Sequence, residues 1–143
     1  MTQLAAKDVI FTLGMKRHPE GGWYAETFVD GDASAGRPRS TAIYYLLEAG
    51  DASHWHRVDA VEVWHYYAGA PLALRISDGK SVDLHMLGSD LDGGERPQVV
   101  VPKQAWQAAV STGAFTLVGC TVAPGFQFSG FELADKNWAP GGD

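Results

Sequence analysis

The sequence has little of what marks a disulfide-bonded, nucleic-acid-binding or membrane protein. Its one cysteine, Cys120, excludes an internal disulfide and lies in an apolar run, which indicates a buried, inert thiol. Eleven basic residues against seventeen acidic ones give a net charge of -6, which argues against a nucleic-acid partner because phosphate binding needs a basic surface. The sequence also lacks a signal-peptide pattern and any apolar run of the roughly 18 residues that a transmembrane helix needs. We therefore expect a cytoplasmic protein without a membrane partner.

What the sequence does contain is a pattern of short strands in one domain. Its 143 residues are 45% hydrophobic, which is enough for a single core, and no repeat or linker divides them. Apolar residues at helical spacing predict a short amphipathic helix over about 4–14, ended by Gly14. Beyond it, runs rich in aromatic and β-branched residues alternate with turn-forming clusters. We predict strands near 23–29, 39–47, 53–58, 61–68, 71–77, 80–87, 98–102, 105–110, 115–123 and 126–133.

Turn residues separate these strands closely. Asp78-Gly79 predicts a hairpin with a type I′ turn, in which both central residues have positive φ. Pro124-Gly125 predicts a second turn, and residues 30–38 and 88–97 read as polar loops. Many short strands joined by close turns predict an all-β sandwich or small barrel over about 20–134.

The segment Ser53-His54-Trp55-His56-Arg57 carries the clearest chemical signal. Side chains alternate along a strand, so His54 and His56 are expected on one face, where Glu62 of the next strand can meet them. Two imidazoles and a carboxylate suit a divalent transition metal. They suit equally well the acid, base and hydrogen-bonding groups of a small-molecule pocket. The spacing leaves both interpretations open.

The strand 61–67 indicates a wall of the same site. Glu62, Trp64 and Tyr66 share one face, and aromatic rings with a few polar groups are typical of a ligand cavity. A wet, exposed sheet face with solvated histidines is the alternative interpretation. His18 precedes Pro19 in a Gly-rich turn, where we expect it to bond the loop backbone.

Several segments together resemble the cupin superfamily. The His-x-His pair with Glu62 and Gly69 resembles the first cupin motif, and residues 101–104 with Trp106-Gln107 resemble a degenerate second one. The whole chain is similar to small single-domain cupins of unknown function, the fifth cupin profile family. The matching segments are Leu13-Gly14-Met15, residues 18–24, residues 40–47, Ser53 with His56-Arg57, residues 62–65 with Gly69, Val101-Pro102 with Trp106-Gln107, and residues 119–126.

The resemblance implies a fold and an assembly. It predicts one cupin domain over residues 1–143, an all-β double-stranded β-helix (jelly-roll) barrel that holds a small-molecule ligand. It also implies a homodimer. It does not imply one reaction, because cupins catalyse many and some catalyse none.

The sequence departs from the cupin motifs in ways that weaken a metal site. Five residues separate His56 from Glu62, where the first motif has three or four. The second motif has glycine where this chain has Gln104 and histidine where it has Gln107. The expected metal ligands are thus His54, His56 and Glu62 with Gln107 as a fourth, and an amide oxygen is a poor ligand for transition metals.

Three functions remain open at this point. In an isomerase- or epimerase-like enzyme, His56 is the base, Glu62 fixes its tautomer, and Tyr66 or Tyr44 is the acid. There, Arg39 or Arg57 holds an anionic group. In a metal-dependent oxygenase or isomerase, the ligands are those named above. In a non-catalytic binding or sensing protein, the cavity only holds a ligand. The expected ligand-binding residues are Tyr44, Trp64, Gln107, Phe126 and Arg39.

Overall fold

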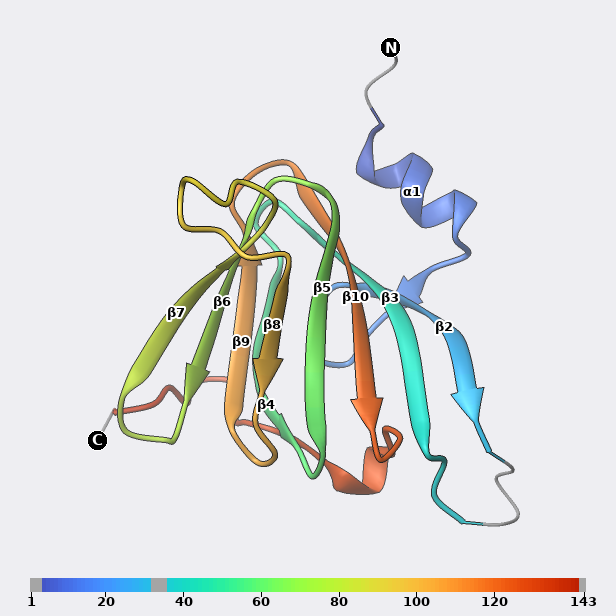
Figure 1. Cartoon of the computed structure of the whole chain (residues 1–143), viewed down its shortest axis with the longest axis vertical. Helices are drawn as coiled ribbons and strands as arrows, with labels where there is room; N and C mark the ends of the chain where they lie inside the picture. The colour runs from blue at the N-terminus through green and yellow to red at the C-terminus, as the bar shows by residue number, and fades with distance from the viewer. Residues whose placement is uncertain (1–3, 32–35, 142–143) are drawn as a thin grey trace.

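Two antiparallel β-sheets pack face to face beside a short N-terminal helix, α1 (Ala6–Thr12), in the computed structural model (Figure 1). The structure describes residues 4–31 and 36–141. The larger sheet has the order β1 (Lys16–Arg17), β2 (Trp23–Asp30), β3 (Ser40–Glu48), β10 (Phe115–Ala123), β5 (Val61–Gly69) and β8 (Gln98–Val101). The smaller has the order β11 (Phe131–Leu133), β4 (Ala52–Val58), β9 (Trp106–Ser111), β6 (Leu72–Ser77) and β7 (Val82–Leu87).

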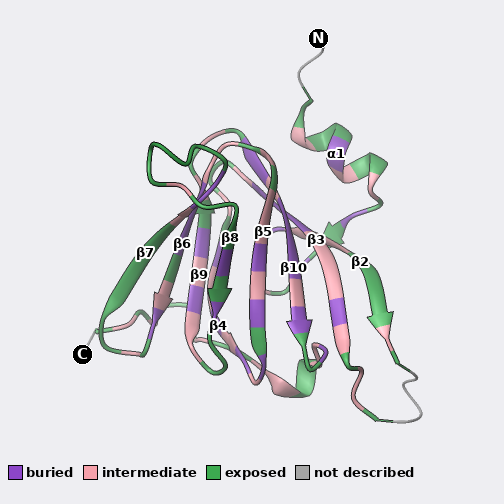
Figure 2. Cartoon of the chain, in the orientation of Figure 1, coloured by how far each residue is buried: buried purple, intermediate pink, exposed green. Residues whose placement is uncertain are grey.

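This arrangement confirms the predicted all-β jelly roll, as a two-sheet sandwich rather than a closed barrel. Side chains alternate along each strand, and the apolar ones that point inward fill the space between the sheets. Trp64 on β5 is 1% exposed and Leu74 on β6 is fully buried, whereas Tyr67 at the far end of β5 is exposed. β10 lies between β3 and β5 and is buried along most of its length (Figure 2). No helix of the described residues has the length and apolar character needed to span a membrane.

The predicted last strand is wrong over most of its length. Within 126–133, residues Phe128–Gly130 form a 3-10 helix and only Phe131–Leu133 form a strand. The Phe126 amide donates to Thr41 Oγ1 at 2.9 Å, which ties the chain to β3 before it reaches β4. This tertiary bond, together with the local bond from Gly130 N to Gln127 O, outweighs the strand propensity of the phenylalanines.

The hairpin at Asp78-Gly79 joins β6 to β7 as predicted, but its turn is not type I′. Only Gly79 of the two has positive φ (104°). The Asp78 carboxylate accepts the amides of Lys80 at 2.8 Å and Ser81 at 3.0 Å, so a longer loop replaces the two-residue turn. An aspartate side chain that bonds the backbone ahead of it favours such a loop.

Candidate active site

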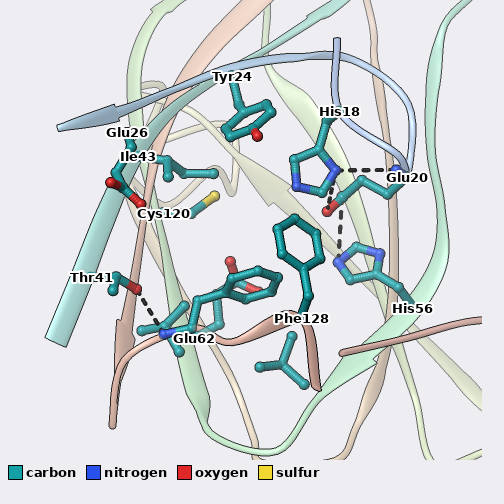
Figure 3. A pocket seen from close by; sticks show the side chains of 13 residues that line it. His18, Glu20, Tyr24, Glu26, Thr41, Ile43, His56, Glu62, Cys120 and Phe128 are labelled. Carbon is teal, nitrogen blue, oxygen red and sulfur yellow. Dashed lines mark hydrogen bonds and ion pairs between the residues drawn. The ribbon is translucent and has the colours of Figure 1, made fainter. Parts of the chain in front are cut away.

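A small cavity lies between the sheets, and side chains from both sheets and from two loops contribute to it (Figure 3). Its volume is about 90 Å³. A single water needs roughly 10–15 Å³, and sites for drug-sized ligands are about 300–1,000 Å³, so this cavity suits a molecule of few atoms. It is lined by His18, Glu20, Tyr24, Glu26, Thr41, Ile43, His56, Val58, Glu62, Cys120, Val122, Phe126 and Phe128.

His56 on β4 is held in one tautomer by the backbone. Its Nδ1 lies 2.7 Å from the carbonyl oxygen of His54, and a carbonyl only accepts, so Nδ1 carries the proton. The side chain is 2% exposed, and this burial lowers its pKa. Neutral His56 therefore presents a bare Nε2, which lies 3.4 Å from Glu20 Oε2.

Glu20 lies between two imidazoles. Its Oε1 is 3.3 Å from His18 Nδ1, and its own amide donates to that nitrogen at 3.1 Å. Neutral His18 thus carries its proton on Nε2, the opposite tautomer to His56. Burial raises the pKa of Glu20, against the opposing effect of His18 and a hydrogen bond from Ser53. Burial likewise lowers the pKa of His18.

Glu62 on β5 is held through a buried hydrogen-bond chain that crosses the sandwich. Trp64 Nε1 donates to Gln107 Oε1 at 2.7 Å, and Gln107 Nε2 donates to Glu62 Oε1 at 2.9 Å. Burial raises the pKa of Glu62 to about 7, although His56 opposes the shift. This carboxyl therefore changes charge near neutral pH, as a proton-transfer group must.

The loop that presents His18 and Glu20 is fixed to the ends of β3 and β4. Tyr45 donates to the Gly21 carbonyl, and the His54 amide donates to the Glu20 carbonyl at 2.8 Å. Gly21 has φ of 107°, and a Cβ there would lie 1.9 Å from the Ala52 carbonyl oxygen. Close backbone contact therefore requires glycine at this position.

Gly21→Ala is expected to lower the free energy of unfolding by about 1–3 kcal/mol more than Gly50→Ala. Gly50 also has a left-handed φ (83°), but no atom lies within 4 Å of a Cβ placed there. Both variants thus carry the same kind of backbone strain, and only Gly21→Ala adds the clash. Urea unfolding of the two proteins measures the difference, and equal losses would contradict the close approach.

The predicted convergence of His54 with His56 is wrong. Along β4 and β9 the pairing runs from Ser53 with Ala109 to His56 with Gln107, so three steps on β4 oppose two on β9. This bulge turns Ser53 and His56 to the interior and His54 outward. His54 Nε2 instead lies 2.9 Å from the carbonyl of Asp135.

Of the other predicted residues, only some lie near the cavity. Glu62 and Phe126 line it, as His56 does. Gln107 lies behind Glu62, where it is 1% exposed, and Trp64 belongs to the hydrophobic core. These two position Glu62 and are not among the residues that line the cavity.

Three further residues lie away from the cavity. Tyr66 donates its hydroxyl to a backbone carbonyl at 2.5 Å on an exposed part of β5. Tyr44 packs edge-on against Tyr67, with ring centroids 6.1 Å apart. Arg39 is 79% exposed and pairs with Asp30 at 2.9 Å. The two tyrosines predicted as acids and the arginine predicted to bind an anion therefore do not line the cavity.

The sequence patterns did not predict that His18, Glu20 and Tyr24 line the cavity. His18 does bond the loop backbone, as predicted, but it also lines the cavity, with the Tyr24 ring 4.7 Å away. No spacing rule joins these residues to His56, because they come from a loop and from the start of a different strand. The match of residues 18–24 to the family pattern was the one available signal. Cys120, predicted to be buried, lies in the cavity wall, and burial raises its pKa well above the usual value.

The side chains do not fit the metal site that the cupin motifs imply. His54 faces away from His56, and the Gln107 oxygen already accepts the Trp64 indole. Over residues 4–31 and 36–141, no three His, Cys, Asp or Glu side chains are grouped so as to hold a metal ion. The expected set of His54, His56, Glu62 and Gln107 is thus not assembled.

Comparison with known proteins identifies relatives over nearly the whole chain. The model of the family described as Cupin superfamily (DUF985) matches residues 7–134. A protein of known structure from Shewanella oneidensis is 37% identical, with a TM-score of 0.88 over 93% of this chain and 86% of that one. A hypothetical protein from Leishmania major is 28% identical, with a TM-score of 0.83 over 92% and 88%.

More distant structures share only the fold. Oxalate decarboxylase from Bacillus subtilis, in a structure at pH 4.6, is 13% identical, with a TM-score of 0.63. The match covers 82% of this chain and 29% of the decarboxylase. A search of curated proteins gives no significant match.

Proposed function

The chain belongs to the Cupin superfamily (DUF985) family, and from that premise we propose that it is an enzyme that moves a proton on a small polar substrate. The observation that carries the proposal is the buried cavity in which neutral His56 directs its bare Nε2 towards a carboxyl group. Strongly shifted pKa values in a cleft are typical of functional sites.

His56 is the base in this proposal. Its Nδ1 proton is fixed on the His54 carbonyl, so Nε2 is free to take a proton from the substrate. The Nε2–H of the imidazolium that forms can donate to the Glu20 carboxyl oxygen 3.4 Å away. Burial keeps the imidazole neutral beforehand, which is the form a base needs.

A carboxyl group supplies the acid. Burial raises the pKa of both Glu20 and Glu62, so each holds a proton at a pH where an exposed glutamate has lost it. Removal of a proton by His56 and its return from a carboxyl on another wall of the cavity would invert or shift a centre beside a carbonyl. This favours the isomerase-like reaction over the metal-dependent one.

The cavity limits the substrate. A volume of about 90 Å³ cannot enclose a sugar nucleotide, and it suits a molecule, or the reacting end of one, with few heavy atoms. Phe126 and Phe128 form part of the wall, where their rings pack edge-on with centroids 4.9 Å apart.

Exchange of carbon-bound protons with solvent tests the proposal directly. A panel of small carbonyl compounds is incubated with the protein in heavy water, and loss of α-proton signals is followed by NMR. We expect exchange by the natural protein and a fall of roughly 100- to 10,000-fold in His56→Gln, the usual contribution of a general base.

His54→Gln is the matched control, because that imidazole lies two residues away and faces outward. It should exchange at the natural rate. A compound that binds and raises the melting temperature without exchanging would favour the non-catalytic binding function. Exchange that survives His56→Gln would place the base elsewhere.

A further inference from the structure

The walls of the cavity hold three carboxyl groups and no lysine or arginine, among the residues that the structure describes. Glu20, Glu26 and Glu62 reach it from the loop before β2, from β2 and from β5 (Figure 3). No lysine or arginine is among the described residues that line it. An anionic substrate would therefore meet three carboxyl groups and no lysine or arginine among the described residues of this lining.

The arginines of this region are paired outside the cavity. Arg37 makes a two-pronged contact with Asp59, at 2.7 and 3.1 Å. Arg57 pairs with Glu132 at 2.8 Å. Arg39, as described above, pairs with Asp30. Recruiting any of these three arginines to an anion in the cavity would break an existing ion pair.

The remaining wall suits a positive charge. Tyr24, Phe126 and Phe128 line the cavity, and aromatic faces attract a cation that lies within about 6 Å of the ring centroid. Lys16 already lies 5.4 Å from the Tyr24 centroid, so among the described residues Phe126 and Phe128 are the lining rings without this contact. Gln107 occupies one acceptor position of Glu62, and a carboxylate has about four.

From these observations we infer that the cavity binds a small cation, a protonated amine of few heavy atoms, with Glu62 as its main anchor and Glu26 at the exposed side. The inference names the substrate class of the site proposed above and rests on that proposal for the reaction. An ammonium beside Glu62 favours the ionised carboxylate, so binding near neutral pH displaces a proton.

Three probes that share an ethyl group and differ in charge test the inference. Ethylammonium, propionate and ethanol are titrated separately into the natural protein at constant ionic strength and pH 7.5, with the melting temperature and calorimetric heat as readouts. We expect ethylammonium alone to bind saturably. Its heat should depend on the ionisation enthalpy of the buffer in the direction of proton release.

Glu62→Gln should weaken ethylammonium binding about tenfold or more, as loss of a charged hydrogen-bond partner does. Glu132→Gln is the control, since that carboxylate pairs with Arg57 outside the cavity. Preference for propionate, proton uptake on binding, or an equal response to all three probes would overturn the inference.

The outcome is separable from that of the exchange assay. Saturable amine binding without proton exchange on any amine-bearing carbonyl compound would keep this inference and remove the proposed reaction. Exchange on anionic or neutral compounds only would keep the reaction and remove this inference.

Discussion

Gln107→Leu is expected to lower the free energy of unfolding by about 2–6 kcal/mol, although leucine has a similar volume. The substitution leaves the Trp64 indole N–H and the Glu62 carboxyl without their partners in a buried site. An unsatisfied buried donor or acceptor costs about 1–3 kcal/mol, and two are created. Urea unfolding monitored by tryptophan fluorescence measures the loss.

A double-mutant cycle shows whether the loss comes from the hydrogen-bond chain. Trp64→Phe removes the indole N–H, so Gln107→Leu should be milder in that background by about 1 kcal/mol or more. Purely additive effects would mean that Gln107 contributes only packing, and would contradict the role assigned to the chain.

Glu62→Gln is expected to stabilise the protein, and more so at high pH. The amide keeps an acceptor for the Gln107 N–H but cannot ionise. Since the pKa of Glu62 is raised from 4.5 to about 7, the folded state holds its proton more tightly than the unfolded state. The natural protein therefore loses stability as pH rises from 4.5 through 7, by roughly 3 kcal/mol in total.

The measurement is the difference in unfolding free energy between Glu62→Gln and the natural protein at pH 5 and pH 8. We expect the difference to grow with pH in favour of the variant. Repeating the comparison in a His56→Gln background removes the titration of the imidazole from the difference. A constant difference for Glu62→Gln would mean that its carboxyl ionises normally.

The sequence predicted the fold more fully than the site, for a physical reason. Alternation along β5 placed Glu62 and Trp64 on one buried face, and the structure agrees. The same rule failed on β4, because a bulge between Ser53 and His56 changes the phase and no residue in the segment marks it.

The sequence also did not predict which loop residues line the cavity. His18 and Glu20 reach the cavity through a turn that depends on tertiary bonds to Tyr45 and His54, and such bonds are not encoded in a local pattern. The prediction for Arg39 differs from the structure for a similar reason. Its ion pair with Asp30 depends on tertiary structure, which a local sequence pattern does not show. The homodimer stays a prediction.

The state of the two cavity imidazoles tests the central claim most directly. Nitrogen-15 NMR of the histidine side chains gives the tautomer and charge of each ring, and spectra of His18→Gln and His56→Gln assign the signals. At pH 7 we predict neutral His56 with its proton on Nδ1 and neutral His18 with its proton on Nε2. An imidazolium at His56, or a proton on its Nε2, would leave no base facing the cavity and would contradict the account.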